Sequence, residues 1–350
     1  MEDFFIRTYK KGDEIQIIKL FKFAFGEEMT LEEWQWKYQN NPEGFVTFLA
    51  LFGDVIVSHY GIPYIKLKLG NKLIRAASPG DTMVHPDYKG KRGGKLAFFS
   101  EKMWPEQTVK DNLYLGFGFP NERIYKVGKR FGKYNDVGKV DVLWKYLVRG
   151  WKRGKILQEM SRVYFKFDYF FKKLKVKKGD FKIKKITCFD ERADNLWEEV
   201  KDLYPIAIVR DKRYLNWRYV ERPVDYTIFC LEKGEKWLGW IVFRVKREEF
   251  NDIFVKAGYI VDMLTVNRRD VAEYLIMTAI DFFFKKRAFF IETWLSPADK
   301  NYNTFKNFGF LKQREVYMVW RPFLIKNEKE TNLVGDIHNW YITLSEALVI

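Results

Sequence analysis

The stretch that decides the fold is DTMVHPDYKGKRGGKLAFFS, from Asp81 to Ser100. Residues 82–84 suit a β-strand, His85-Pro86-Asp87 ends that strand, and Leu96 begins an apolar helical stripe. Glycines in the intervening loop let the backbone approach an anion closely, while the helix N-terminus and the lysines attract it. We therefore predict a phosphate-binding loop, and the alternative is a basic surface turn before an ordinary helix. The predicted binding residues are Lys89, Gly90, Lys91, Arg92, Gly93, Gly94 and Lys95.

Two familiar phosphate-binding motifs do not fit the chain. A Walker loop requires GxxxxGK[ST], but Lys95 stands where the second glycine should follow Gly90, and Gly116-Phe117-Gly118 lacks the third glycine of GxGxxG. The segment instead resembles the acetyl-coenzyme A loop of the GNAT N-acetyltransferase superfamily, Arg/Gln-x-x-Gly-x-Gly/Ala after a strand that ends in Val-x-Pro. Lys89 replaces the Arg/Gln of that signature, and Arg92 stands in the place of its middle glycine.

The composition is that of a globular protein with an excess of positive charge. The chain has 350 residues, of which 47% are hydrophobic, so two domains with packed cores are expected. The net charge of +16 favours an anionic partner such as coenzyme A, nucleic acid, an acidic acceptor or a membrane face. The alternative is a lysine- and glutamate-rich surface of the kind found in thermophile proteins.

Several classes of protein are not expected. Cys188 and Cys230 lie in apolar, strand-like runs, so we predict buried, reduced core residues. The three histidines are scattered, so we predict no metal, and no run of 18 apolar residues exists to form a transmembrane segment. The N-terminus lacks the apolar core and cleavage site of a signal peptide, and we expect a cytoplasmic protein.

The chain repeats itself. At an offset of 181 residues, Trp36-Lys37-Tyr38 falls on Trp217-Arg218-Tyr219 and Asp81 falls on Asp262. Further along the chain the offset is 177, as for Phe131-Gly132 and Phe308-Gly309, so the second copy has lost four residues. The loss falls where the first copy has its glycine loop. We therefore predict one phosphate-binding loop, in the first copy.

The order of expected elements resembles the GNAT plan in both copies, and Ser296 to Phe310 resembles its fourth-helix motif. The resemblance implies an α+β fold of two tandem GNAT-like domains, each a mixed, mostly antiparallel sheet flanked by helices. We expect a first domain with the acyl-CoA loop at 1–149, a basic aromatic linker helix at 150–180, a second domain without the loop at 181–325, and a C-terminal tail at 326–350.

The linker from Trp151 to Asp180 has ten Lys/Arg against three Asp/Glu and reads as a basic amphipathic helix. Such a helix can lie on an anionic membrane or on nucleic acid. We predict instead that it packs against the neighbouring domains and retains neither nucleic acid nor anionic vesicles at physiological salt. Its apolar stripe consists of Ile156, Met160, Val163, Phe167, Phe170, Phe171 and Leu174.

The resemblance implies transfer of an acyl group, with acetyl-CoA as donor, to the amine of a small molecule, sugar or peptide. Met83 and Val84 would offer backbone groups to the pantetheine arm, and Asn121 occupies the place of the fourth-helix asparagine. One alternative is an aminoacyl-tRNA-dependent peptidyltransferase, which needs no phosphate loop. The other is a non-catalytic GNAT-like module that binds coenzyme A or another ligand, which the departure at Arg92 favours.

The reaction requires a base for the ammonium and often an acid for the leaving thiolate. Asp81 and His85 are candidate bases, although Asp81 could equally be a structural turn residue. The tyrosine that serves as family acid is replaced by Gly128, so Tyr125, one turn earlier, is the candidate. The apolar end of the chain predicts a docked tail. The resemblance makes the carboxylate of Ile350 a further candidate base, against a tail that only covers a surface.

Overall fold

The first copy is a mixed α/β unit. The computed structural model describes residues 4–88, 103–149, 154–176, 179–250 and 252–347. The helices of the first copy are α1 (Glu14–Phe25), α2 (Leu31–Lys37), the 3-10 turn η1 (Pro86–Tyr88), α3 (Trp104–Lys110) and α4 (Glu122–Phe131). Its strands are β1 (Phe5–Thr8), β2 (Phe45–Phe52), β3 (Val55–Leu69), β4 (Lys72–Ala77), β5 (Gly80–Val84), β6 (Leu113–Gly118) and β7 (Asn135–Tyr146).

The second copy repeats this order after the linker helix α5 (Lys155–Leu174). Its helices are α6 (Glu191–Val200), η4 (Lys201–Leu203), α7 (Lys212–Tyr219), α8 (Arg269–Lys285) and α9 (Tyr302–Asn307), and the tail adds α10 (Glu328–Val334), η5 (Ile337–Asn339) and η6 (Leu344–Ala347). Its strands are β8 (Lys182–Ile186), β9 (Ile206–Ile208), β10 (Thr227–Lys233), β11 (Lys236–Phe250), β12 (Ile253–Thr265), β13 (Phe290–Leu295) and β14 (Leu311–Pro322).

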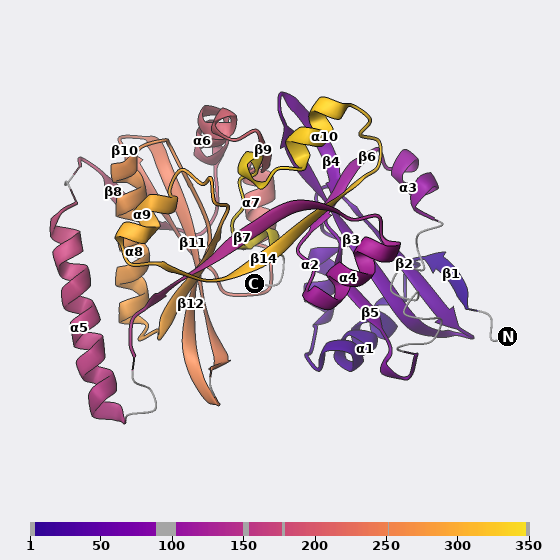
Figure 1. Cartoon of the computed structure of the whole chain (residues 1–350), viewed down its shortest axis with the longest axis horizontal. Coiled ribbons are helices and arrows are strands. Elements are labelled where there is room, and N and C mark those ends of the chain that lie inside the picture. The colour runs from indigo at the N-terminus through magenta and orange to yellow at the C-terminus, as the bar shows by residue number, and fades with distance from the viewer. Residues whose placement is uncertain (1–3, 89–102, 150–153, 177–178, 251, 348–350) are drawn as a thin grey trace.

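The two copies share one sheet. The 14 strands are mostly antiparallel, with helices on both sides, and the two copies form the two halves of the molecule in Figure 1. This confirms the predicted fold class. Strand β11 spans the residues of β3 shifted by 181, and β13 those of β6 shifted by 177. The offsets found in the sequence therefore connect strands in equivalent places.

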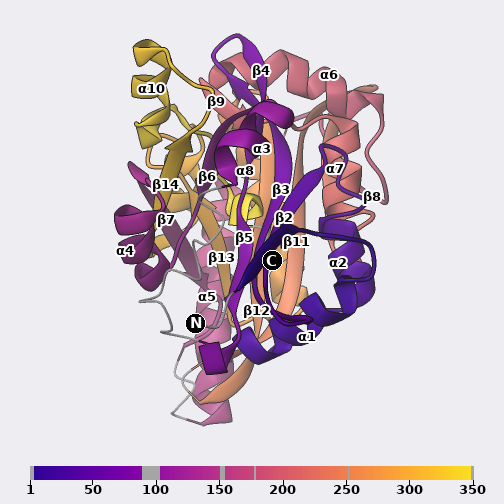
Figure 2. The same cartoon turned by 90° about the vertical axis from the view of Figure 1, so that its right-hand side faces the viewer.

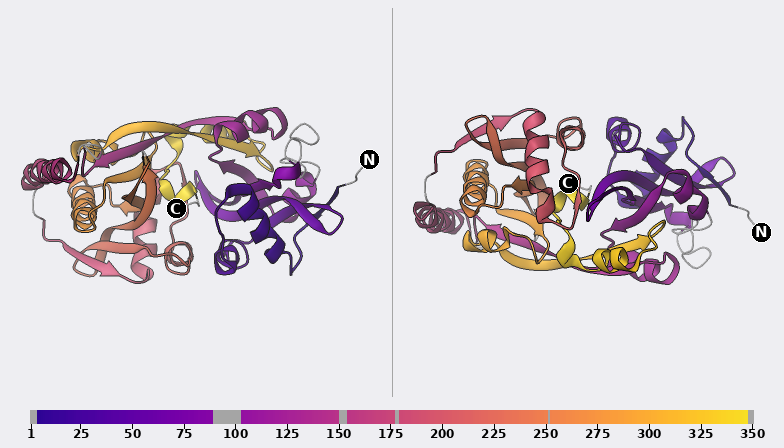
Figure 3. Two further views of the ribbon diagram at one scale, coloured as in Figure 1. Left: turned by 90° about the horizontal axis from the view of Figure 1, so that it is seen from below. Right: turned by 90° about the horizontal axis from the view of Figure 1, so that it is seen from above.

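The copies exchange their last strands. Strand β14 of the second copy pairs with β6 of the first, and β7 of the first copy pairs with β13 of the second. Between these pairs, β7 and β14 run antiparallel to each other, with Val140 opposite Val316. Figure 3 shows the two long strands crossing from one half of the molecule to the other. Each half therefore depends on the other to complete its sheet.

A second junction joins the helices α2 and α7. The indoles of Trp36 and Trp217 stack with their ring centroids 5.1 Å apart. Trp36 Nε1 donates to the Trp217 carbonyl at 2.6 Å, and Trp217 Nε1 donates to the Trp36 carbonyl at 3.0 Å. This reciprocal contact between equivalent residues indicates an approximate two-fold relation between the copies.

Strand β5 is set apart from the rest of the sheet. In the first copy a non-strand segment, Ser78-Pro79, separates β4 from β5. Strand β4, before this segment, pairs with β6, and β5, after it, pairs with β3. Among the described strands, β5 and β6 do not pair with each other. In the second copy the equivalent residues form the single strand β12, which pairs with β11 along its length. Strand β12 pairs with β13 only over residues 257–259, so the two copies separate at the same place, and the first copy differs by the interruption before β5.

Helix α5 lies at the edge of the molecule, outside α8 (Figure 1). The prediction that its apolar stripe packs against the domains is wrong. Only Arg162 and Tyr169 of the helix are buried, and all seven stripe residues are exposed. The helix contacts the body through the opposite face, because the long side chains of Arg162 and Tyr169 hold it there.

Two further sequence expectations need comment. Cys230 is buried in β10, but Cys188 is exposed in a turn after β8, so the prediction that both are core residues is wrong for Cys188. Its run ITCF begins at Ile186, the last residue of β8, so the other three residues of the run lie outside the strand. Within the described ranges, no helix is long and apolar enough to cross a membrane.

The described tail returns to the middle of the molecule. Trp340, Tyr341, Ile342 and Leu344 are buried, and Tyr341 N donates to the Ile206 carbonyl at 2.8 Å. In Figure 2 the last described turn of the tail, in yellow, is seen among the central strands. The tail is therefore tied down as far as residue 347.

Candidate active site

A cleft of about 320 Å³ lies where β5 and β6 separate. Its floor consists of residues 78–82 of the first copy and residues 116–121 at the end of β6. Aromatic rings form most of the walls, and they come from both copies because β14 is exchanged. These rings are Phe25, Tyr60, Trp104, Phe117, Phe119, Tyr134, Trp294, Trp320 and Phe323.

One buried polar cluster borders the cleft. The Asp81 carboxylate accepts a hydrogen bond from Lys37 Nζ at 2.7 Å and one from the Tyr38 hydroxyl at 2.8 Å. The side chains of Lys37 and Asp81 are 6% and 10% exposed, so this ion pair is largely shielded from water. His59 Nδ1 lies 2.8 Å from the Asp81 carbonyl oxygen and must donate to it, because a carbonyl can only accept.

The environment of Asp81 favours its charged form. Burial alone would raise its pKa, but the Lys37 ammonium and the hydrogen bonds from Lys37 and Tyr38 lower the pKa below its ordinary value. Burial lowers the pKa of His59 to about 4, so the imidazole is neutral at neutral pH. A carboxylate held in this way is a weak base, which fits a structural role better than proton abstraction.

The local sequence builds this geometry. Asp81 has a φ of 48°, in the left-handed region that aspartate tolerates better than most residues, and it follows the break at Ser78-Pro79-Gly80. Gly61 lies opposite on β3, at a register shift of the ladder between β3 and β5. A Cβ at Gly61 would overlap the Tyr38 hydroxyl, so glycine is required for that hydroxyl to reach Asp81.

The second copy has the equivalent pair but no open cleft. The Tyr219 hydroxyl donates to Asp262 at 2.8 Å, as Tyr38 does to Asp81. Asp262 also accepts from Arg210 and from Thr343 of the tail, and Arg210 pairs with Glu346 at 2.6 Å. The remaining cavity there is about 10 Å³. The tail therefore fills the place that is open in the first copy.

The predicted coenzyme-binding residues are only partly described. Lys89, Gly90, Lys91, Arg92, Gly93, Gly94 and Lys95 lie outside the described residues. Asn121 lines the cleft and caps α4, where its side chain accepts from Ile124 N at 2.9 Å. Met83 is buried, with its carbonyl bonded to Ser58 Oγ, and Val84 pairs with Ser58 in the ladder. Gly80, Asp81 and Thr82 are the β5 residues that line the cleft, and Met83 and Val84 are not among its lining residues.

The structure does not bring the predicted catalytic residues together. His85 packs edge-on against Phe23, with ring centroids 5.0 Å apart, outside the lining of the cleft. Tyr125 donates to Asp136 at 2.8 Å, and this bond raises the pKa of Tyr125. Neither side chain contributes to the cleft wall, and only Asp81 of the described candidates does. Ile350 lies outside the described residues, although Glu346 and Ala347, just before it, line the cleft.

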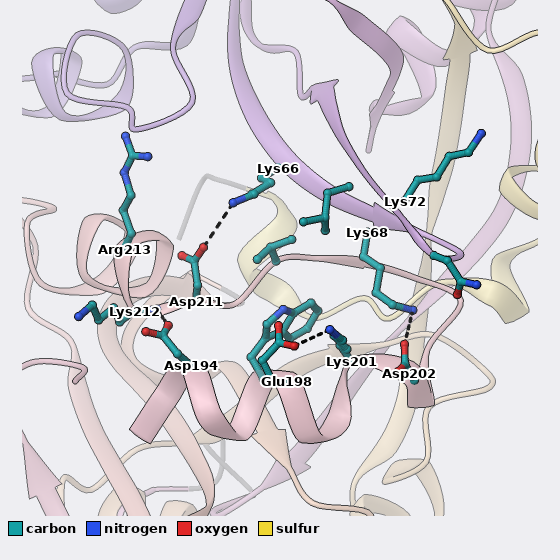
Figure 4. Close-up of a pocket in the computed structure, with 14 residues that line it drawn as sticks. Lys66, Lys68, Lys72, Asp194, Glu198, Lys201, Asp202, Asp211, Lys212 and Arg213 are labelled. Carbon is teal, nitrogen blue, oxygen red and sulfur yellow. Dashed lines mark hydrogen bonds and ion pairs between the residues drawn. The ribbon is translucent and has the colours of Figure 1, made fainter. Parts of the chain in front are cut away.

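A second pocket, of about 610 Å³, lies between β3 of the first copy and α6 and α7 of the second (Figure 4). Its walls carry charges of both signs. Lys68 pairs with Asp202 at 3.3 Å, and Lys66 lies 3.9 Å from Asp211. Because these ion pairs join residues of the two copies, we interpret the pocket as part of the interface between the copies.

Sequence reasoning missed Lys37 and Tyr38 as partners of Asp81. A signal for them was present, because Trp36-Lys37-Tyr38 and Asp81 recur together at the same offset of 181. It also missed the aromatic walls supplied by β13, β14 and the segment after it, such as Trp294, Trp320 and Phe323. Those residues reach the first copy's cleft through the strand exchange, for which the sequence gives no local sign.

Comparison with known proteins agrees with this architecture. Residues 5–127 match the sequence profile of the acetyltransferase (GNAT) domain. A search of curated proteins by sequence returned no match.

Solved structures with the same fold cover nearly the whole chain. A probable N-acyltransferase from Enterococcus faecalis has a TM-score of 0.65 at 13% identity, covering 92% of this chain and 73% of that one. A GCN5-related N-acetyltransferase from Anabaena variabilis also has a TM-score of 0.65, at 11% identity, covering 91% of this chain and 73% of that one. N-myristoyltransferase from Saccharomyces cerevisiae, solved with bound myristoyl-CoA, has a TM-score of 0.61 at 10% identity, covering 93% and 80%.

Proposed function

We propose, from the premise that the chain carries a GNAT acetyltransferase domain, that it transfers an acyl group from coenzyme A to an amine. In this reaction the amine nitrogen forms a bond to the acyl carbon, the carbon–sulfur bond breaks, and the thiolate takes up a proton. The proposed acceptor is the amine of a small molecule, a sugar or a peptide.

The observation that carries the proposal is the separation of β5 from β6 around an apolar cleft. The edge of β5 toward β6 has no strand partner among the described residues, so its backbone groups remain available to an amide-containing ligand. The pantetheine arm of coenzyme A is such a ligand, and Thr82 and Phe117 lie on the two sides of the gap. The cleft is therefore suited to hold the arm, with the loop at 89–95 proposed for the phosphates.

Acetyl is the first candidate for the acyl group, and a longer chain is the second. The second candidate is favoured by the aromatic lining, because apolar walls stabilise an apolar chain that leaves water. It is also favoured by the likeness in fold to a protein solved with myristoyl-CoA. Turnover measured with acetyl-CoA and with myristoyl-CoA separates the two candidates.

The proposal is tested by calorimetry with coenzyme A. We expect one site per chain, because only the first copy has a glycine loop in its sequence and an open cleft. Gly94→Glu should abolish binding, since it adds bulk and negative charge against the pyrophosphate. The matched control is Gln313→Glu on the exposed surface of β14, which should bind normally. Two equivalent sites, or none, would refute the proposal, and binding without transfer to any amine would indicate a non-catalytic module.

The end of the chain is our proposed source of the base. Asp81 is held in an ion pair, His85 and Tyr125 do not line the cleft, and the tail reaches the cleft at Ala347. Deleting Val349 and Ile350 should abolish acyl transfer while coenzyme A binding and the melting temperature stay unchanged. Unchanged turnover would eliminate this role and leave the tail as a cover for the domain surface.

The expected compartment is the cytoplasm. Cys188 and Cys230 are free thiols in the structure, and unpaired cysteines are typical of reducing compartments. Fractionation of cells that express the full chain, followed by detection of the protein, tests this expectation.

A further inference from the structure

Helix α5 presents an apolar face to solvent. Ile156 is 79% exposed, Phe167 60% and Leu174 66%, and Met160, Val163 and Phe170 are exposed beside them. Their spacing of three and four residues places them on one side of the helix, along its whole length. Monomeric proteins rarely leave an apolar stripe of this extent uncovered, so it indicates a binding surface.

The other face fixes the helix to the body of the protein. Arg162 Nη1 donates to the Ala288 carbonyl at 3.2 Å, and the Tyr169 hydroxyl donates to the Met277 carbonyl at 3.1 Å. Lys173 forms an ion pair with Asp281 at 2.6 Å on the same side. The apolar stripe therefore points away from the second copy. Helix α5 itself lies at the rim of the molecule (Figure 1).

Positive charge surrounds the stripe. The segment 151–180 has ten Lys/Arg against three Asp/Glu, a net charge of +7. On α5 itself, Lys155 and Lys166 are exposed, whereas Lys172 is paired with Asp168 and Lys173 with Asp281. An apolar stripe bordered by lysines matches an anionic lipid surface, where acyl chains take up the apolar side chains and headgroups attract the ammonium groups.

We propose that α5 docks this protein on an anionic lipid bilayer, with the helix lying in the interface and its apolar stripe facing the acyl chains. A second copy of the chain fits the stripe less well, since pairing two α5 helices would bring two segments of +7 together. The described helices include none that could cross a membrane, so the contact is peripheral. This inference does not depend on the proposed acyl transfer.

The test is sedimentation with vesicles made of equal parts phosphatidylcholine and phosphatidylglycerol, at physiological salt. We expect the full chain to sediment with these vesicles and much less with phosphatidylcholine alone. Phe167→Glu should weaken binding at least about tenfold, roughly 1.4 kcal/mol, because it places a charge in the middle of the stripe. The control is Phe5→Glu at the opposite end of the molecule, where the phenylalanine is 62% exposed and the change should leave binding unaltered.

Three outcomes would overturn the proposal. The wild-type chain could remain in the supernatant with both kinds of vesicle, or Phe167→Glu could sediment as well as the wild type does. The chain could also form a dimer in solution that Phe167→Glu dissociates, in which case a second copy covers the stripe. The melting temperature of each variant is measured to show that the variant is folded. Met160→Gln, also within the stripe, provides a second and milder change.

Discussion

Replacing Lys37 by methionine should destabilise the protein strongly. The substitution keeps the length of the side chain but removes the ammonium group that lies 2.7 Å from the Asp81 carboxylate. Asp81 would then remain buried with one hydrogen bond, from Tyr38, and no compensating charge. The pKa of the Asp81 carboxyl group should rise. Burial favours its neutral form, and without the Lys37 ammonium only the hydrogen bond from Tyr38 would still favour the charged form strongly.

The magnitude follows from the burial of the pair. Breaking a buried ion pair by removing one partner costs about 3–5 kcal/mol, since the remaining charge stays desolvated. An unfolding entropy of about 2.1 cal/mol/K per residue over 350 residues gives roughly 0.7 kcal/mol/K, so the melting temperature should fall by about 4–7 °C. Because the native pKa of Asp81 is lowered, the stability it contributes is present above its unfolded pKa and is lost as pH falls through the lower, native value.

The assay is calorimetric unfolding of four proteins: the wild type, Lys37→Met, Asp81→Asn and the double variant. The double variant should be more stable than the sum of the single changes implies, by about 1–3 kcal/mol, because it leaves neither charge unpaired. Lys22→Met is the control, since Lys22 pairs with Glu28 at the same distance of 2.7 Å but on the open surface, and its melting temperature should not change. Additive losses, or a Lys37→Met variant as stable as the control, would refute the reasoning.

Three other predictions concern the surroundings of the cleft. His59 has a pKa of about 4 in the folded state and about 6.5 in the unfolded state, so the folded state binds fewer protons between these pH values. Lowering the pH through this range should therefore reduce the free energy of unfolding by up to about 3 kcal/mol. In chemical denaturation, His59→Phe should lose less stability than the wild type over the same pH range. Gly61→Ala should cost about 1–3 kcal/mol in the same assay, because the methyl group overlaps the Tyr38 hydroxyl. Trp36→Ala should cost about 3–5 kcal/mol and, since β7 and β14 are exchanged, calorimetry should still show one transition for both copies.

Much of the fold could be predicted because the sequence repeats itself. The offsets of 181 and 177 residues relate β3 to β11 and β6 to β13, and apolar patterning marks the strands. The exchange of β7 and β14 could not be predicted. Both strands lie at the end of their copies, and their pairing depends on contacts between residues more than 140 positions apart, such as Val140 and Val316. A pattern of apolar residues specifies a strand but does not specify its partner.

The orientation of α5 could not be predicted for a different reason. Its apolar stripe is the strongest signal in the helix, and burial of that stripe is the usual outcome for a helix on a globular protein. The face that holds the helix contains Arg162 and Tyr169, which reach carbonyl groups of α8 and of the turn after it. Polar anchors of this kind carry no periodic signal, so the sequence could show that the helix is amphipathic but not which face meets the protein.

The candidate site differs between the two repeats in what surrounds a shared pair of residues. Both copies keep a tyrosine bonded to an aspartate, Tyr38 to Asp81 and Tyr219 to Asp262, so this pair belongs to the shared framework of the repeat. What differs is the strand that carries the aspartate, which is interrupted before Asp81 and continuous through Asp262 in β12. In both copies the end of this strand has no partner toward the next parallel strand among the described residues, and a protein must cover such an edge, pair it or use it for a ligand. The tail covers the position in the second copy through Thr343 and Glu346, and the first copy keeps it open as an aromatic cleft. The Tyr–Asp pair therefore belongs to the framework of both copies, and we look for catalytic groups among those that only the first copy brings to its cleft.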